Sequence, residues 1–61
     1  MKRQALAEAE RCLRRALAIK ETRLGPRHLD TQNTATELWN VLEEKGGQEA
    51  EMEALDAKHG I

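Results

Sequence analysis

Three side chains in the sequence could take part in nucleophilic or metal chemistry: Cys12, His28 and His59. A cysteine nucleophile needs a base such as histidine, and a zinc site needs cysteine and histidine ligands at short, characteristic spacings. Neither histidine is near Cys12 in the sequence, and no protease motif surrounds the cysteine. We therefore expect Cys12 to be a small core residue and His28 to lie in a connector. We predict a chain that is not an enzyme and has no metal or cofactor.

A second set of side chains could bind phosphate groups, because a basic helix face is the minimum requirement for contact with nucleic acid. The basic residues of this set are Arg11, Arg14, Arg15, Lys20 and Arg23. Glu8, Glu10 and Glu21 dilute this face, and the chain lacks the several aromatic residues on which bases stack. A solvated or protein-facing surface is therefore favoured. A small nucleic-acid-associated protein that uses its basic first helix remains the alternative.

Trp39 is the only aromatic residue and the side chain best suited to anchor a partner. Its spacing from Ala35 and Leu42 places it on an apolar helix face, which favours a position in the core. The alternative is that its indole protrudes into a groove or a neighbouring subunit. In that case Trp39→Ala would weaken assembly more than it would lower the helicity of a monomer.

The apolar spacing predicts three helices, at about residues 4–24, 30–46 and 48–59. One stripe of the first helix contains Leu6, Ala9, Leu13, Ala16 and Leu17, and it is widened by Ala5, Cys12 and Ile19. Gly25 commonly ends a helix in the left-handed conformation, and Pro26 blocks continuation. We expect this helix to stop there.

The second predicted helix can be capped by Asp30 or Thr31. Its apolar face contains Ala35, Leu38, Trp39 and Leu42, and Gly46-Gly47 ends it. The third predicted helix directs Ala50, Ala54, Leu55 and Ala57 toward its neighbour. Because the connectors are short, we expect a single all-α domain over residues 1–61, with three antiparallel helices in an up-down-up order.

Part of the sequence repeats, since Glu8-Ala9-Glu10 recurs as Glu49-Ala50-Glu51. Further motifs are Arg15-Ala16-Leu17-Ala18-Ile19, Leu24-Gly25-Pro26-Arg27-His28-Leu29-Asp30-Thr31 and Glu43-Glu44-Lys45-Gly46, together with Ala7 and Leu38. With these motifs, residues 5–46 resemble the long tetratricopeptide (TPR) repeats of kinesin light chains and many bacterial repeat proteins. Leu29 stands where that family usually has proline, and the stretch before the second Glu-Ala-Glu is one residue short.

The resemblance implies about one and a half repeats of a TPR-like α-α superhelix. It implies that Ala9 and Ala16 admit a partner helix and that Gly46 makes a tight turn. Leu38 and Leu42 would fill the groove between helices. A repeat unit buries its face only against neighbours, so the implied partner is another protein chain or further TPR repeats. A homo-oligomer is one way to supply such a neighbour.

The function that the resemblance implies is a non-catalytic interaction or assembly module that binds through helical faces. By analogy with concave TPR surfaces, the candidate partner-binding residues of the second helix are Thr34, Glu37, Trp39, Asn40 and Val41. Those of the first helix are Arg11, Arg14 and Arg15. The residues assigned to packing are Ala9, Leu13, Ala16, Leu17, Gly25, Pro26, Leu38, Leu42 and Gly46.

Size and charge limit the remaining possibilities. A 61-residue chain buries a small core, and one cysteine cannot form an internal disulfide, so a partner subunit is the expected source of added stability. Basic residues dominate up to residue 29 and acidic residues dominate after it, although the net charge is −1. No stretch is apolar enough to span a membrane. We expect a soluble cytoplasmic protein; the alternative is an organellar one with residues 1–20 as an amphipathic presequence.

Overall fold

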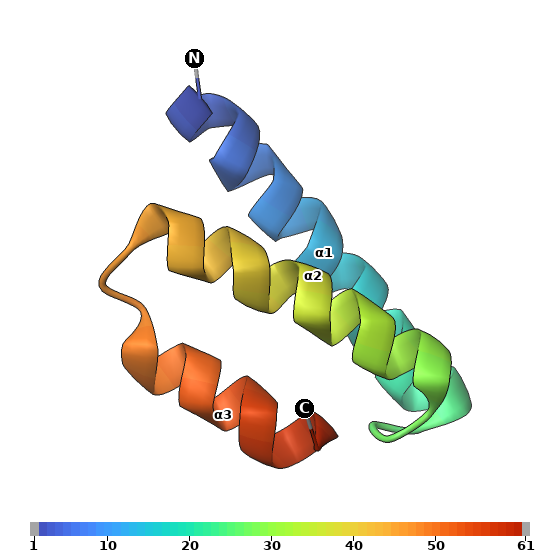
Figure 1. Cartoon of the computed structure of the whole chain (residues 1–61). Coiled ribbons are helices and arrows are strands. Elements are labelled where there is room, and N and C mark those ends of the chain that lie inside the picture. Colours follow the sequence, from blue (N-terminus) through green and yellow to red (C-terminus); the bar gives the residue numbers. More distant parts are fainter. Residues whose placement is uncertain (1, 61) are drawn as a thin grey trace.

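The chain is all-α, as predicted. The computed structural model describes residues 2–60, which form α1 (Lys2–Leu24), α2 (Leu29–Lys45) and α3 (Glu49–His59). Figure 1 shows the three helices running back and forth, with α2 between the other two. Within the described residues, α1 and α3 each pack against α2, and their backbones do not approach each other. The central helix therefore carries the packing of the domain.

The turn between α1 and α2 is built by Gly25, whose φ of 96° suits a residue without a side chain. Its N–H donates to the Glu21 carbonyl over 3.1 Å, and this bond closes the last turn of α1. The predicted caps of α2, Asp30 and Thr31, are wrong. His28 is the N-cap, because its Nδ1 accepts a hydrogen bond from the Asp30 backbone N–H at 3.2 Å. The imidazole thus serves as the N-cap acceptor, a role that Asp, Asn, Ser or Thr usually has at the start of a helix.

The turn between α2 and α3 is built by Gly46 and Gly47, whose φ angles are 81° and 71°. The Gly46 N–H donates to the Leu42 carbonyl over 3.0 Å, which confirms that Gly46 closes α2. At the far end of α3, Gly60 has φ 71°, and its N–H donates to the Asp56 carbonyl over 2.8 Å. Left-handed glycines therefore mark the end of each helix.

One apolar cluster joins all three helices. Its buried members are Leu17 of α1, Ala35, Leu38 and Leu42 of α2, and Leu55 of α3. Partly buried side chains that pack against them are Leu13, Trp39 and Met52. The predicted core positions of α1 and α2 are therefore confirmed for Leu17, Leu38 and Leu42, and Trp39 contacts the core, as its spacing favoured.

The outer part of the predicted α1 stripe is not buried. Cys12 and Ala5 are exposed, and Ile19 is 49% exposed. Ala9 and Ala16 are only partly buried. The reason is that α1 packs against one helix, so a narrow arc around Leu17 is covered and the residues on the opposite side face solvent. The prediction that Cys12 is a core residue is wrong.

The buried face of α3 also differs from the prediction. Ala50, Ala54 and Ala57 are exposed, and Leu55 is joined on the buried side by His59, with Met52 partly buried. These three residues have the spacing i, i+3 and i+7 of a helix face. A face centred on Leu55 buries two larger side chains, whereas the predicted alanine face would bury little apolar surface.

None of the described helices is both long enough and apolar enough to cross a membrane.

Candidate functional site

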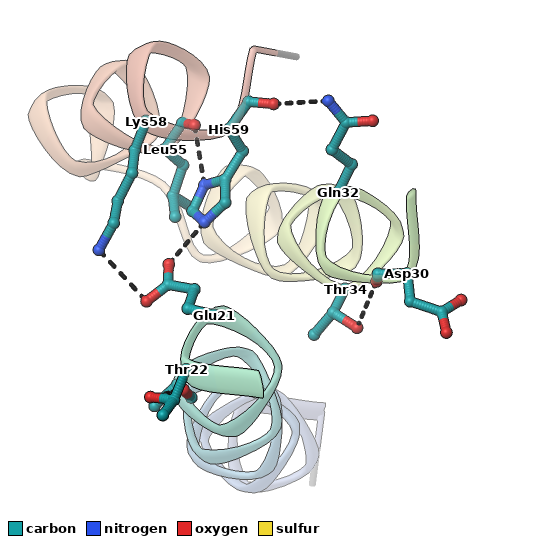
Figure 2. A network of polar contacts seen from close by, with 9 residues as sticks. Glu21, Thr22, Asp30, Gln32, Thr34, Leu55, Lys58 and His59 are labelled. Carbon is teal, nitrogen blue, oxygen red and sulfur yellow. Dashed lines mark hydrogen bonds and ion pairs between the residues drawn. The ribbon is translucent and has the colours of Figure 1, made fainter. Parts of the chain in front are cut away.

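A polar network at one end of the bundle centres on His59, whose side chain is fully buried. Figure 2 shows its ring between α3 and α1. The Nε2 atom lies 2.6 Å from Oε2 of Glu21, and Nδ1 lies 3.1 Å from the Leu55 carbonyl oxygen. Gln32 of α2 donates from Nε2 to the His59 carbonyl over 2.8 Å. One residue near the end of α3 is thereby tied to both other helices.

Both ring nitrogens of His59 lie beside oxygen atoms that can accept a hydrogen bond. Nδ1 faces the Leu55 carbonyl, and Nε2 faces the Glu21 carboxylate. Burial raises the pKa of Glu21, but hydrogen bonds from His59 and Lys58 outweigh that effect and hold its pKa below the usual range. The Glu21 carboxylate is therefore shared between the His59 ring of α3 and Lys58 Nζ, which lies 3.2 Å away.

A second polar cluster joins the three helices near the opposite end of the bundle. Glu10 of α1 accepts hydrogen bonds from Arg14 Nε over 2.8 Å and from Lys45 Nζ over 2.5 Å. Arg14 also pairs with Glu51 of α3. The bonds from Lys45 and Arg14 hold the pKa of Glu10 below its usual range, and the bond from Arg14 does the same for Glu51. Arg14, predicted as partner-binding, is therefore engaged within the chain.

The other candidate residues of α2 differ in burial. Thr34 is wrongly predicted as a partner-lining residue, because it is buried between α1 and α2, where its Oγ1 accepts a hydrogen bond from Lys20 Nζ over 2.9 Å. Its hydroxyl also donates to the Asp30 carbonyl. Glu37 and Asn40 are exposed.

Among the described residues, one open groove lies on α2 and another on α1. The α2 groove is lined by Asn40, Val41, Glu43 and Glu44. The α1 groove is lined by Ala18, Ile19, Thr22 and Arg23. The candidate residues Asn40 and Val41 therefore belong to one surface feature, whereas Trp39 is not part of its lining.

The outer face of α1 is basic around an apolar centre. Ile19 has Arg15 and Arg23 one helical turn away on either side, and all three side chains are exposed. Arg11 and Cys12 are exposed on the same helix. The α1 groove thus combines an apolar floor with basic neighbours, while the α2 groove has acidic ones.

Both histidines have partners within the chain. Both ring nitrogens of His59 are occupied by structural partners, and Nδ1 of His28 caps α2. Among residues 2–60, no three His, Cys, Asp or Glu side chains come together as a metal site would require.

Sequence reasoning missed the partners of His59. Glu21 is 38 positions from His59 along the chain, and Lys58 is 37 positions from Glu21. No local spacing rule connects residues that far apart, and the only signal available was that His59 precedes Gly60 at the end of a predicted helix. Comparison with models of protein families, with curated proteins and with solved structures finds no match to this chain.

Proposed function

We propose that this chain is a non-catalytic protein-interaction or assembly module of TPR type, which binds another protein through the outer face of α1. The observation that carries the proposal is the exposed Ile19, about half of whose surface remains in contact with solvent. An exposed isoleucine beside Ala18 in a groove offers apolar surface that a partner helix can cover. The basic residues on either side of it would select a partner with acidic side chains.

The arrangement of the helices also supports the proposal. Among the described residues, the backbones of α1 and α3 each approach only α2, and polar side chains join the sides on which α1 and α3 face each other. Their outer sides are left uncovered. In an array of repeats such outer sides are covered by the next unit. The helix–turn–helix formed by α1, the Gly25 turn and α2 coincides with the segment that resembles the TPR connector. The uncovered faces are where a neighbouring repeat or another protein would pack.

A nucleic-acid partner is the competing possibility, since Arg11, Arg15 and Arg23 are exposed on one helix. Phosphate binding uses charge alone, however, and gains nothing from an isoleucine at the centre of the face. Ion pairs with Glu10 and Glu51 also occupy Arg14. The combination of apolar centre and basic flanks favours a protein helix.

Photo-cross-linking tests the proposal directly. Ile19 is replaced by benzoylphenylalanine in the full chain, and the matched control carries the same residue at Ala54, which is exposed on α3. After irradiation in an extract of the source cells, we expect a protein adduct from position 19 that is absent from position 54. The adduct should resist nuclease and should decrease when Arg15→Glu and Arg23→Glu are added.

Two results would overturn the proposal. One is an adduct from position 19 that nuclease removes, which would establish the nucleic-acid function. The other is the same set of protein adducts from positions 19 and 54, which would mean that the α1 face has no preference for any partner.

A further inference from the structure

We propose that the partner of the α1 groove is the α2 groove of a second copy of this chain, so that copies associate head to tail. This inference rests on the proposed function, because it names the protein that the α1 face binds. In the proposed interface, Ile19 of one copy contacts Val41 of the next, and ion pairs between arginines and glutamates surround this contact.

The charged side chains that remain unpaired within the chain differ in sign around the two grooves. The cations Arg14, Lys45 and Lys58 are all neutralised within the chain, by Glu10, Glu21 and Glu51. Among the described residues, exposed charges that form no internal ion pair remain on every helix, including Glu8 on α1 and Glu49, Glu53 and Asp56 on α3. Around the two grooves, however, they differ in sign. The basic ones on the outer face of α1 are Arg11, Arg15 and Arg23. The acidic ones toward the end of α2 are Glu37, Glu43 and Glu44.

The two grooves have matching arrangements of apolar and charged side chains. Each places one β-branched side chain between like charges about one helical turn away. Ile19 has Arg15 and Arg23 at i−4 and i+4. Val41 has Glu37 and Glu44 at i−4 and i+3. If the two helices pack along each other with Ile19 against Val41, both ends of the contact bring an arginine to a glutamate.

The low net charge of the chain allows copies to approach one another. The net charge of the whole chain is only −1, so copies do not repel one another as highly charged molecules do. The charge is instead separated between helices, which steers opposite faces together. Because the two grooves lie on different helices, each copy in a pair keeps one groove free, and the assembly continues as a chain or closes into a ring.

Sedimentation velocity of the full chain over a wide range of concentrations is the test. The first variant, Arg15→Glu with Arg23→Glu, makes both grooves acidic. The second, Glu37→Lys with Glu44→Lys, reverses the two charges that flank Val41 and leaves Glu43 as the one acidic side chain lining the α2 groove. We expect the wild type to grow in mass with concentration, and we expect each variant alone to associate at least about tenfold more weakly.

An equimolar mixture of the two variants should associate again, because the reversed grooves fit each other and the unchanged grooves do so as well. A third variant controls for simple attraction between chains of opposite net charge. Glu49→Lys with Glu53→Lys changes the charge by the same amount but lies on α3, outside both grooves. It should associate like the wild type, and it should not restore association to the first variant. Circular dichroism of each variant verifies that the helices are retained.

A wild type that stays monomeric at every concentration would overturn the inference. So would a mixture in which the α3 variant restores association as well as the α2 variant does. The proposed function is judged separately, by the adducts from position 19. If those adducts contain a different protein, the interaction module stands and only its identification with a second copy is lost.

Discussion

At the scale of the residue, the buried polar side chains have different local environments. Among the described residues, Thr31, Thr34 and His59 are the buried polar ones. Thr34 accepts a bond from Lys20, and His59 is bonded through both ring nitrogens. The Thr31 hydroxyl has no hydrogen-bond partner, so it loses its contact with water on folding and gains nothing in exchange.

We therefore predict that Thr31→Val raises the free energy of unfolding by about 1 kcal/mol, because valine has nearly the same shape and no hydroxyl to desolvate. The matched control is Thr36→Val. Thr36 is exposed and its Oγ1 donates to the Gln32 carbonyl over 2.9 Å, so no gain is expected there. Urea denaturation measures both; a loss of stability in Thr31→Val would show that the hydroxyl is satisfied in solution.

The second prediction concerns the pair formed by His59 and Glu21. Glu21→Gln removes the carboxylate that faces Nε2 and leaves a fully buried ring beside a weaker partner. We expect a loss of about 1 to 3 kcal/mol, with faster hydrogen exchange in α3 than in the first half of α1. The control Glu53→Gln changes an exposed residue of α3 and should leave exchange unaltered. Uniform acceleration in all helices would contradict a local role.

At the scale of the element, helix positions follow from local pattern and helix orientation does not. The predicted ranges 4–24, 30–46 and 48–59 agree with the structure within two residues at each end, because glycine positions and apolar spacing are properties of the segment itself. Which face is buried depends on how many neighbours a helix has. The error at Cys12 arose in this way, since the stripe was wide enough for two closely packed neighbours and the backbone of α1 approaches only α2.

The ion pairs that join α3 to the other helices should make its docking sensitive to acid. The pKa values of Glu10, Glu21 and Glu51 all lie below the ordinary glutamate value of 4.5 in the folded chain. A lowered pKa in the folded state means that the stabilisation is complete above pH 4.5 and is lost as the pH falls through the folded pKa values. All three carboxylates are partly solvated, so each of their pairs with the exposed cations Arg14, Lys45 and Lys58 contributes about 1 kcal/mol or less.

We accordingly predict that the contribution of these carboxylates to the urea midpoint of unfolding stays nearly constant from neutral pH to about pH 4.5. Below about pH 4.5 this contribution declines. Glu10→Gln should lower the midpoint at neutral pH and make the acid decline smaller, because one of the titrating pairs is gone. An acid decline of the same size in Glu10→Gln would show that other groups are responsible.

At the scale of the whole molecule, one small core makes the three helices interdependent. Each helix contributes a buried side chain to the cluster around Leu38 and Leu42, and among the described residues the backbones of α1 and α3 approach only α2. A domain of this size has a total stability of roughly 3 to 9 kcal/mol at typical values per residue. The loss of one central leucine, about 2 to 5 kcal/mol, is comparable to the whole.

Leu42→Ala is therefore predicted to unfold all three helices together under conditions where Ile19→Ala leaves them intact. Leu42 is fully buried, whereas Ile19 is half exposed and contributes to the outer face. Amide resonances from each helix, followed through a thermal melt, should share one midpoint in the wild type. Separate midpoints for α1 and α3 would show that the chain is not a single cooperative unit.

Trp39 has a consequence for how this molecule can be observed. The sequence contains no tyrosine and no phenylalanine, so near-ultraviolet absorbance and intrinsic fluorescence arise from a single indole. That indole is half-buried on α2 against the core that all three helices share. Its emission should shift toward the red when water enters the core and toward the blue when a neighbouring molecule covers its exposed edge. The chain thus carries its own label-free optical probe at the helix on which the other two depend.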